Sequence, residues 1–343
     1  MKRKMRKPGG RWCIGLLALS ACAADSSAIS MADDASGAAA SVLADEAGAP
    51  SGGASSQPVA YEDPALQCYR FTAYASPSAK TEKYSVPTTP DLYVGFNIKA
   101  PWPGTQYIKS IRSVIDNAKV VHHWQLYRNL NGGSEGIFTN DNTLHPDAEL
   151  LYGFAPGTDD LYFDRDVGMA VPAGSVFQLE NHYNNRTGSP VRDGSGLEIC
   201  VTPTKPAHVA AMSFVGSLFI NGTGATGTCT HASKEPVHLI MGFPHMHLKG
   251  IHMKVDWTHA DGSVQTIHDR PFDFNYQRTY MFRDVVLQPG DKLTTTCTYS
   301  EPARVGKRTT DEMCYFFSVH WPAGALTRRN AFAAMQGPNT CMD

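Results

Sequence analysis

Two histidines separated by one residue, His245 and His247, form the strongest local candidate for metal chemistry in the sequence. On a β-strand, residues i and i+2 point to the same face, so the two imidazoles would form a chelate. The apolar run 239–244 precedes them, and we expect it to be mostly buried. Buried imidazoles are costly unless they bond to something, which favours metal ligation over the alternative of two exposed surface histidines.

A second pair, His122 and His123, has no spacer between its members. Neighbouring residues on a regular strand face opposite sides, so both could bind one metal only at a strand end or at a bulge. The alternative is one core histidine and one exposed histidine. His182 lies on a further expected strand, where it shares a face with Gln178 and Glu180. That face is either solvated or the wall of a site, in which Glu180 would orient a ligand without binding the metal itself.

The thioether of Met313 gains interest beside these histidines, although alone it would be read as a core residue. Histidine and methionine together are a set of borderline and soft ligands that favours copper, and Cu(I) especially. Zinc prefers histidine, cysteine or carboxylate ligands. We expect the remaining histidines to be structural: His145, His208, His231, His238, His252, His259, His268 and His320.

Short strands have to position these residues, because no long stretch of the sequence shows a helical period. Residues 92–98 alternate between large apolar side chains and smaller or polar ones, which predicts a half-buried strand. Similar runs occur at 119–128, 176–183, 210–220, 237–248, 251–257, 293–299 and 313–321. With Gly- and Pro-containing turns between them, these runs predict an all-β sandwich or barrel. The run 202–206, which contains two prolines, is the expected boundary between two domains.

The N-terminal segment is similar to a bacterial lipoprotein signal. Basic residues up to Arg11 precede an apolar stretch, 12–19, that is too short to span a bilayer as a helix. Cys22 follows soon after and would be acylated; the alternative is an ordinary signal peptide cleaved nearby. Residues 1–22 are thus expected to be the signal, and residues 23–61, rich in Ala, Ser and Gly, a disordered tether. The chain would be exported and held by lipid alone, with the outer membrane favoured, facing the periplasm or the cell surface.

Charge and cysteine content narrow the class of protein. The formal net charge is -2, and no basic block follows the signal, which argues against nucleic acid as a partner. Outside the N-terminal segment the cysteines are Cys68, Cys200, Cys229, Cys297, Cys314 and Cys341. An even number in an exported chain suggests three disulfides, for which spacing alone permits fifteen connectivities.

The order of these motifs resembles the copper type II, ascorbate-dependent monooxygenases, the family of peptidylglycine α-hydroxylating and dopamine β-monooxygenases. The resemblance covers residues 62–341, and the matching segments are Val121-His122-His123, Leu179-Glu180-Asn181-His182-Tyr183, His245-Met246-His247-Leu248-Lys249-Gly250 and Asp311-Glu312-Met313-Cys314. It implies two consecutive jelly-roll β-sandwich domains, residues 62–204 and 205–343. Each domain would hold one copper, and the two sites would face each other across a solvent-filled cleft.

The same resemblance assigns the ligands residue by residue. The electron-storing copper would be held by His122, His123 and His182. The copper at which oxygen and substrate react would be held by His245, His247 and Met313. The resemblance also implies the disulfides Cys68–Cys200, Cys229–Cys341 and Cys297–Cys314.

The reaction that the resemblance implies is hydroxylation of a C–H bond of a small organic substrate. The oxidant would be O₂, and the reductant ascorbate or another one-electron donor, with the redox chemistry carried by copper. Phe243 stands where peptide-amidating members have an Arg that grips the peptide carboxylate, and Phe317 stands where they have a Tyr. Peptide amidation is therefore disfavoured, and a less polar pocket is expected. Glu180 instead resembles the dopamine β-monooxygenase members, without establishing a catecholamine substrate.

Two other classes of protein remain open. A surface lipoprotein that binds or buffers copper without turnover would need the same ligands. A zinc or iron enzyme of cupin type could use His245 and His247, but it needs a Glu a few residues further on, where the sequence supplies only His252. Oxygen consumption by the copper-loaded protein separates the first class from a monooxygenase, and metal analysis separates the second.

Overall fold

Strand β3 (Leu92–Lys99) forms where the sequence alternates between large apolar and smaller residues. The computed structural model describes residues 66–130, 132–139, 148–326 and 340–341. Within these residues the chain has strands and turns but no helix, which confirms the all-β class. Accordingly, this part of the chain has no helix that could cross a membrane. The expected signal with Cys22, and the expected tether up to residue 61, lie outside the described residues.

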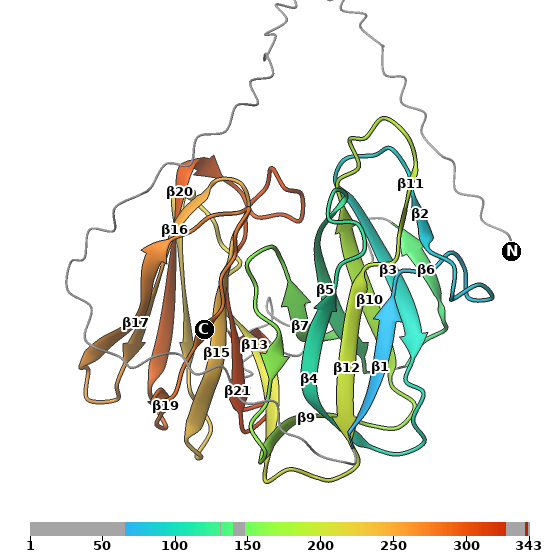
Figure 1. Cartoon of the computed structure of the whole chain (residues 1–343). Helices are drawn as coiled ribbons and strands as arrows, with labels where there is room; N and C mark the ends of the chain where they lie inside the picture. The colour runs from blue at the N-terminus through green and yellow to red at the C-terminus, as the bar shows by residue number, and fades with distance from the viewer. Residues whose placement is uncertain (1–65, 131, 140–147, 327–339, 342–343) are drawn as a thin grey trace, which may run out of the picture. The chain divides into compact units, whose positions relative to one another are not determined.

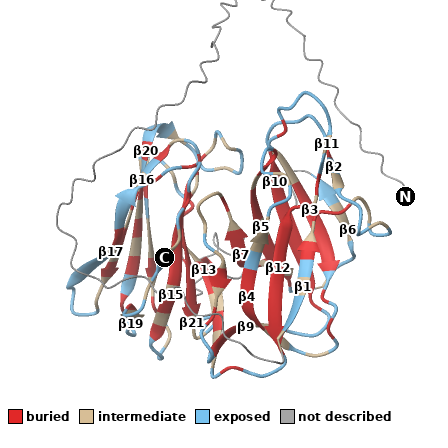
Figure 2. Ribbon diagram, in the orientation of Figure 1, coloured by how far each residue is buried: buried red, intermediate tan, exposed pale blue. Residues whose placement is uncertain are grey.

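A five-stranded antiparallel sheet carries the histidines of the first half of the chain. Its order is β6 (Gly136–Thr139), β3, β10 (Val176–Tyr183), β5 (Val121–Asn129) and β7 (Ala148–Phe154). Strand β10 lies between β3 and β5 and is buried along its whole length (Figure 2). His182 is thus held on an interior strand with a neighbour on each side.

A longer sheet joins the two halves of the chain (Figure 1). Its main path runs β1 (Gln67–Thr72), β12 (Gly196–Thr202), β4 (Gln106–Val114), β9 (Val167–Val171), β13 (His208–Ser217), β21 (Cys314–Trp321), β15 (Val237–His245) and β18 (Tyr280–Met281). The short strands β8 (Leu161–Tyr162), β19 (Val286–Leu287) and β22 (Thr340–Cys341) pair at its sides. The crossing from first to second half is the parallel pair β9–β13, in which Ala210 lies opposite Met169.

Two smaller sheets complete the described fold. Strands β2 (Tyr84–Val86) and β11 (Val191–Asp193) form a two-stranded sheet. A four-stranded antiparallel sheet has the order β14 (Gly222–Thr230), β20 (Lys292–Ala303), β16 (Gly250–Thr258) and β17 (Val264–Pro271). The outer strand β17 is mostly exposed, whereas the inner strands alternate between buried and accessible positions (Figure 2). Antiparallel sheets with one face buried are the usual components of β-sandwich domains.

The buried apolar side chains form two clusters, and the first one crosses the expected domain boundary. Phe71 on β1 packs against Phe177 on β10 with ring centroids 5.2 Å apart, so this cluster fills the space between the long sheet and the five-stranded sheet. It also includes Phe243 on β15 and Phe317 on β21. The second cluster lies between the long sheet and the four-stranded sheet and includes Phe316. The described residues all belong to one compact unit, and the division into domains 62–204 and 205–343 stays a prediction.

Three disulfides fasten the strands, in the pairing that the resemblance implies. Cys68–Cys200 joins the directly paired strands β1 and β12. Cys229–Cys341 ties β14 to β22, and Cys297–Cys314 ties β20 to β21. A chain with three disulfides is typical of an exported protein.

Candidate metal centre

The adjacent histidines of β5 reach one side of the sheet through a β-bulge. In the pairing of β10 with β5, His182 lies opposite His123, whereas the next residue, Tyr183, lies opposite Val121. His122 is therefore the extra residue of the bulge, and the regular alternation of faces is broken at this position. This is the local geometry that two neighbouring histidines need in order to share a metal.

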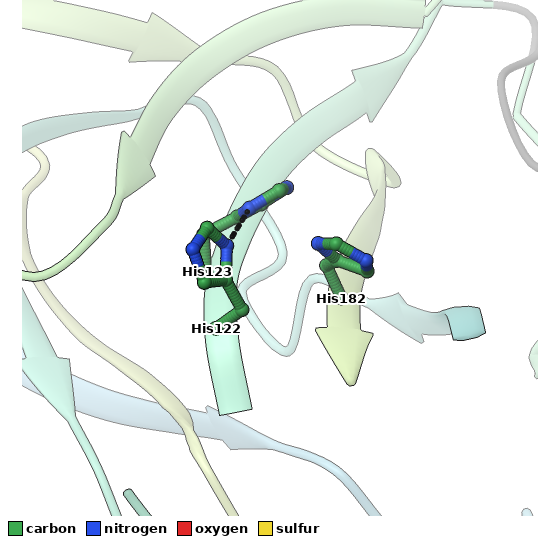
Figure 3. Close-up of side chains that lie close together, drawn as sticks. All are labelled: His122, His123 and His182. Atoms are coloured by element: carbon green, nitrogen blue, oxygen red, sulfur yellow. Dashed lines mark hydrogen bonds between the residues drawn. The ribbon is translucent and has the colours of Figure 1, made fainter. Parts of the chain in front are cut away.

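The three imidazoles of this set converge (Figure 3). One nitrogen from each of His122, His123 and His182 lies within 4.8 Å of the others. The Nδ1 atoms of His122 and His123 are 3.0 Å apart. Among the described residues, the Nδ1 of His182 is buried without a hydrogen-bond partner. An orphaned imidazole nitrogen facing two other imidazoles fits a metal of borderline softness such as copper.

Burial keeps two of these rings neutral. It lowers the pKa of His122 to about 4, with smaller contributions from His182 and His247. It lowers the pKa of His123 well below its usual value, and the nearby His182 acts in the same direction. A metal ion binds the neutral imidazole, so rings of this kind need not lose a proton to a metal at neutral pH.

The ring of His182 is fixed by residues that the sequence analysis did not identify. Its Nε2 is 2.6 Å from the Asp91 carboxylate, and Tyr93 stacks on it with centroids 4.2 Å apart and planes 6° apart. The hydrogen bond from His182 is the largest of the influences that lower the pKa of Asp91 to about 2. A carboxylate bonded to one ring nitrogen leaves the other nitrogen for a metal.

The second pair, His245 and His247, does not lie on the single strand that the sequence had predicted. The predicted strand 237–248 is wrong at its end, because β15 stops at His245 and His247 lies in the following turn. The buried carboxylate of Glu312 causes this: it accepts the backbone N–H of His247 at 2.8 Å and that of Lys249 at 2.6 Å. These bonds replace the strand ladder with a turn. The two imidazoles still lie together, with centroids 5.4 Å apart and planes at 90°.

Hydrogen bonds determine which nitrogen of each of these two rings is left to bind a metal. The side-chain amide of Gln277 donates to the Phe274 carbonyl, so its oxygen faces His245 and accepts from Nδ1 at 3.2 Å. The Nδ1 of His247 donates to the Asp311 carbonyl at 3.1 Å. The Nε2 of His245 therefore stays available, whereas His247 also has a hydrogen bond to the backbone of Arg308. Burial lowers the pKa of His245 to about 3 and that of His247 to about 4.

Met313 lies on a stretch of chain that passes alongside both histidines. Asp311, two residues before it, bonds to His247, and Tyr315, two residues after it, pairs with His245 in the β15–β21 ladder. The Met313 side chain is half-buried, and its carbonyl accepts a hydrogen bond from Tyr299 at 3.0 Å. The backbone thus carries Met313 to the neighbourhood of the pair, as a third ligand requires.

The two sets of candidate ligands lie closer together than a solvent-filled cleft would allow. The ring centroids of His123 and His245 are 6.4 Å apart. Phe274 stacks on His122 at 4.5 Å and lies 6.4 Å from His247. The expected cleft is therefore wrong for this structure. The two sets lie close together because one apolar cluster continues across the two halves of the chain. Phe243 and Phe317 belong to this cluster.

A small pocket lies where the two sets meet. His123 and His245 line it, together with the aromatic rings of Phe154, Phe243 and Phe317. Phe243 and Phe317 are directly paired across β15 and β21, and their rings are 4.8 Å apart. Among the described residues that line this pocket, none is Asp, Glu, Lys or Arg. Phe243 and Phe317 thus place apolar rings beside His245, and their role as a substrate pocket stays a prediction.

Glu180 is buried on β10, two residues before His182 and on the same face. Burial, followed by the charges of Asp91 and Glu180, raises the pKa of Tyr93. The negative charge of Glu180 therefore acts on the side chain of Tyr93, which stacks on His182. The role of Glu180 in orienting a metal ligand stays a prediction. Glu312 had appeared in the sequence only as part of a motif, and no local signal marked Gln277 or Phe274.

The second half of the chain is similar to a known protein family. Residues 221–336 match the family described as copper type II ascorbate-dependent monooxygenase, C-terminal domain. Over this segment the chain is similar to the copper type II ascorbate-dependent monooxygenases. The matched segment includes His245, His247 and Met313, so the second candidate set lies inside the monooxygenase-like region.

Several curated monooxygenases are similar to the chain over a longer span. DBH-like monooxygenase protein 1 of Gallus gallus is 26% identical over 251 residues, which cover 62% of this chain and 41% of that protein. The protein of the same name from Homo sapiens is 26% identical over 247 residues, covering 61% and 40%. Dopamine beta-hydroxylase of Canis lupus familiaris is 24% identical over 244 residues, covering 61% and 39%. The chain thus spans about 40% of the length of these relatives.

Proposed function

We propose that this protein is a copper-dependent monooxygenase that hydroxylates a C–H bond of a small organic substrate with O₂. The observation that carries the proposal is the convergence of His122, His123 and His182 within 4.8 Å, beside a second buried pair, His245 and His247. Two copper ions would bind, one to the first three histidines and one to the pair together with Met313. Distant homology to copper monooxygenases supports this assignment.

Copper supplies the one-electron redox chemistry that no side chain in either set can provide. The net reaction consumes the substrate C–H, O₂, two electrons and two protons, and yields the C–OH product and water. The two electrons come from a one-electron donor such as ascorbate, acting twice. The protein's own groups orient the ligands: Asp91 holds His182, Gln277 holds His245, and the Asp311 carbonyl holds His247.

The pocket between the two sets supports a small and uncharged substrate. Phe154, Phe243 and Phe317 provide apolar walls next to His245. A charged substrate group would find no counter-ion among the described lining residues, and burying an unpaired charge is costly. We therefore propose a substrate without the carboxylate of peptides or the ammonium of catecholamines.

Export and lipid anchoring through Cys22 form a separate part of the proposal. The three disulfides support export, because such bonds persist in oxidising compartments. With lipid on Cys22 as the anchor, a Cys22→Ser variant should leave the membrane fraction and appear in soluble fractions. Retention of that variant with the membranes would exclude lipid as the anchor.

Metal analysis with electron paramagnetic resonance (EPR), followed by oxygen uptake with a reductant and neutral aromatic substrates, tests the enzymatic assignment. We expect two copper ions per chain and substrate-dependent uptake. A Met313→Leu variant should keep copper at the first set and lose the hydroxylation. Copper binding with no oxygen uptake under any reductant would instead leave the alternative, a copper-buffering surface protein. One zinc with no copper preference would point to the cupin class.

A further inference from the structure

A segment from the second half of the chain contacts the ring that the first metal set depends on. Thr309 donates its hydroxyl hydrogen to the same Asp91 oxygen that bonds to His182, at 2.7 Å. Two residues earlier, the Lys307 carbonyl accepts a hydrogen bond from Tyr93, the residue that stacks on His182. Both supports of the His182 ring are therefore held by residues more than two hundred positions further along the chain.

The same segment contacts the second set. The Asp311 carbonyl accepts from His247, and the Asp311 carboxylate is held by Arg304 at 3.1 Å. Thr309 and Asp311 are separated by a single residue, so one short stretch of backbone bonds to the surroundings of both sets. We call residues 304–311 the bridging segment.

We propose that Asp91 and Thr309 are positioning residues for the first copper set, and that the bridging segment makes the geometry of that set depend on the other half of the chain. Asp91 fixes the tautomer and the orientation of His182, and Thr309 fixes Asp91. The inference rests on the proposed function, because it concerns how the candidate ligands are held for copper.

The backbone at Asp91 supports a specific placement of this carboxylate. Its φ is 57°, and it is the one non-glycine residue with a positive φ in the part of the chain that the structure describes. Asp and Asn tolerate this left-handed conformation better than most residues. The conformation turns the chain immediately before β3 and brings the carboxylate to His182, which lies opposite Tyr93 in the β3–β10 pairing.

The chemical consequence concerns the strength of the His182 ligand. A carboxylate that accepts the N–H of a ligating imidazole makes the ring a stronger donor and keeps its other nitrogen aimed at the metal. Replacing such a partner typically weakens metal binding by about 10- to 100-fold. A neutral amide at position 91 would keep a possible acceptor but lose the charge, so the oxidised metal would be held less well.

Three matched variants test the proposal in a His245→Ala background, in which only the first set should bind copper. Asp91→Asn preserves the left-handed backbone and removes the charge. Thr309→Val preserves the shape of the side chain and removes the hydroxyl group. Thr310→Val makes the same change at the neighbouring exposed residue, and it serves as the control. Each variant is titrated with Cu(II) against a competing chelator, and its EPR spectrum and reduction potential are recorded.

We expect Asp91→Asn to bind Cu(II) about 10- to 100-fold more weakly, with a changed EPR spectrum and a higher reduction potential. Thr309→Val should change the same three quantities in the same direction by less, and Thr310→Val should match its parent. Unchanged affinity, spectrum and potential in Thr309→Val would overturn the role of the bridging segment, even if Asp91→Asn fails to fold. Absence of any copper binding by the wild-type chain would instead refute the proposed function, and this inference with it.

Discussion

Removal of the Glu312 carboxylate should destabilise the protein more than the removal of any exposed carboxylate nearby. Glu312 is fully buried, and its two oxygens accept the N–H groups of His247 and Lys249 at 2.8 and 2.6 Å. A Glu312→Ala variant leaves both N–H groups without a partner. Each buried unsatisfied donor costs about 1–3 kcal/mol, so we expect a loss of about 2–6 kcal/mol in the free energy of unfolding.

Glu301→Ala is the matched control, because its side chain is 63% exposed and pairs with Lys249 at 3.3 Å. Exposed ion pairs contribute little, and we expect a change of at most about 0.5 kcal/mol. Equilibrium unfolding of the metal-free proteins in urea gives both values. Copper content then shows whether release of the turn also weakens the set that contains His247. Equal urea midpoints for the two variants would refute the reasoning that Glu312 determines this turn.

Three further predictions concern ligand sets, acid stability and disulfides. His122→Ala should lose one copper and keep the other, as metal analysis would show; loss of both would mean one shared site. Burial lowers the pKa of His320 from 6.5 to about 4, so the unfolded chain takes up a proton here at a higher pH than the folded chain does. This contribution to stability is complete above about pH 6.5 and is lost as the pH falls towards 4. A His320→Gln variant should therefore show a smaller decrease in its urea midpoint between pH 7 and pH 4.5 than the wild type does. Identical pH profiles would contradict it. Replacing both cysteines of Cys68–Cys200, which are 132 residues apart, should cost about 4.7 kcal/mol or more, against about 3 kcal/mol for Cys297–Cys314 at 17 residues. The opposite ranking of the two double variants would speak against loop entropy as the main cause.

Local alternation was enough to predict most of the strands that hold the site. The predicted run 176–183 matches β10, because its apolar and polar faces can be read from neighbouring residues alone. The same reading extended the strand 237–248 too far. The carboxylate that ends it belongs to Glu312, 65 positions from His247, and no local pattern reports such a partner.

The supports of the candidate ligands were beyond sequence reasoning for the same reason. Asp91 is 91 positions from His182, and Thr309 is 218 positions from Asp91. Their side chains are common surface types, and only the folded chain brings them together. The bulge at His122 is an intermediate case: adjacent histidines suggested an irregularity, but its position follows from the pairing of β5 with β10.

The disulfide Cys297–Cys314 includes the residue immediately after Met313, so it ties this part of the chain to β20. Before oxidation, the start of β21 lacks this covalent link to β20, and we expect the Met313 side chain to be held less firmly. We therefore expect the set that contains Met313 to acquire its full affinity for copper only after the bond has formed. In a reducing compartment, a newly made chain would then bind copper only weakly at the site that contains Met313. This site would become able to react with oxygen only in the compartment where the cysteines are oxidised.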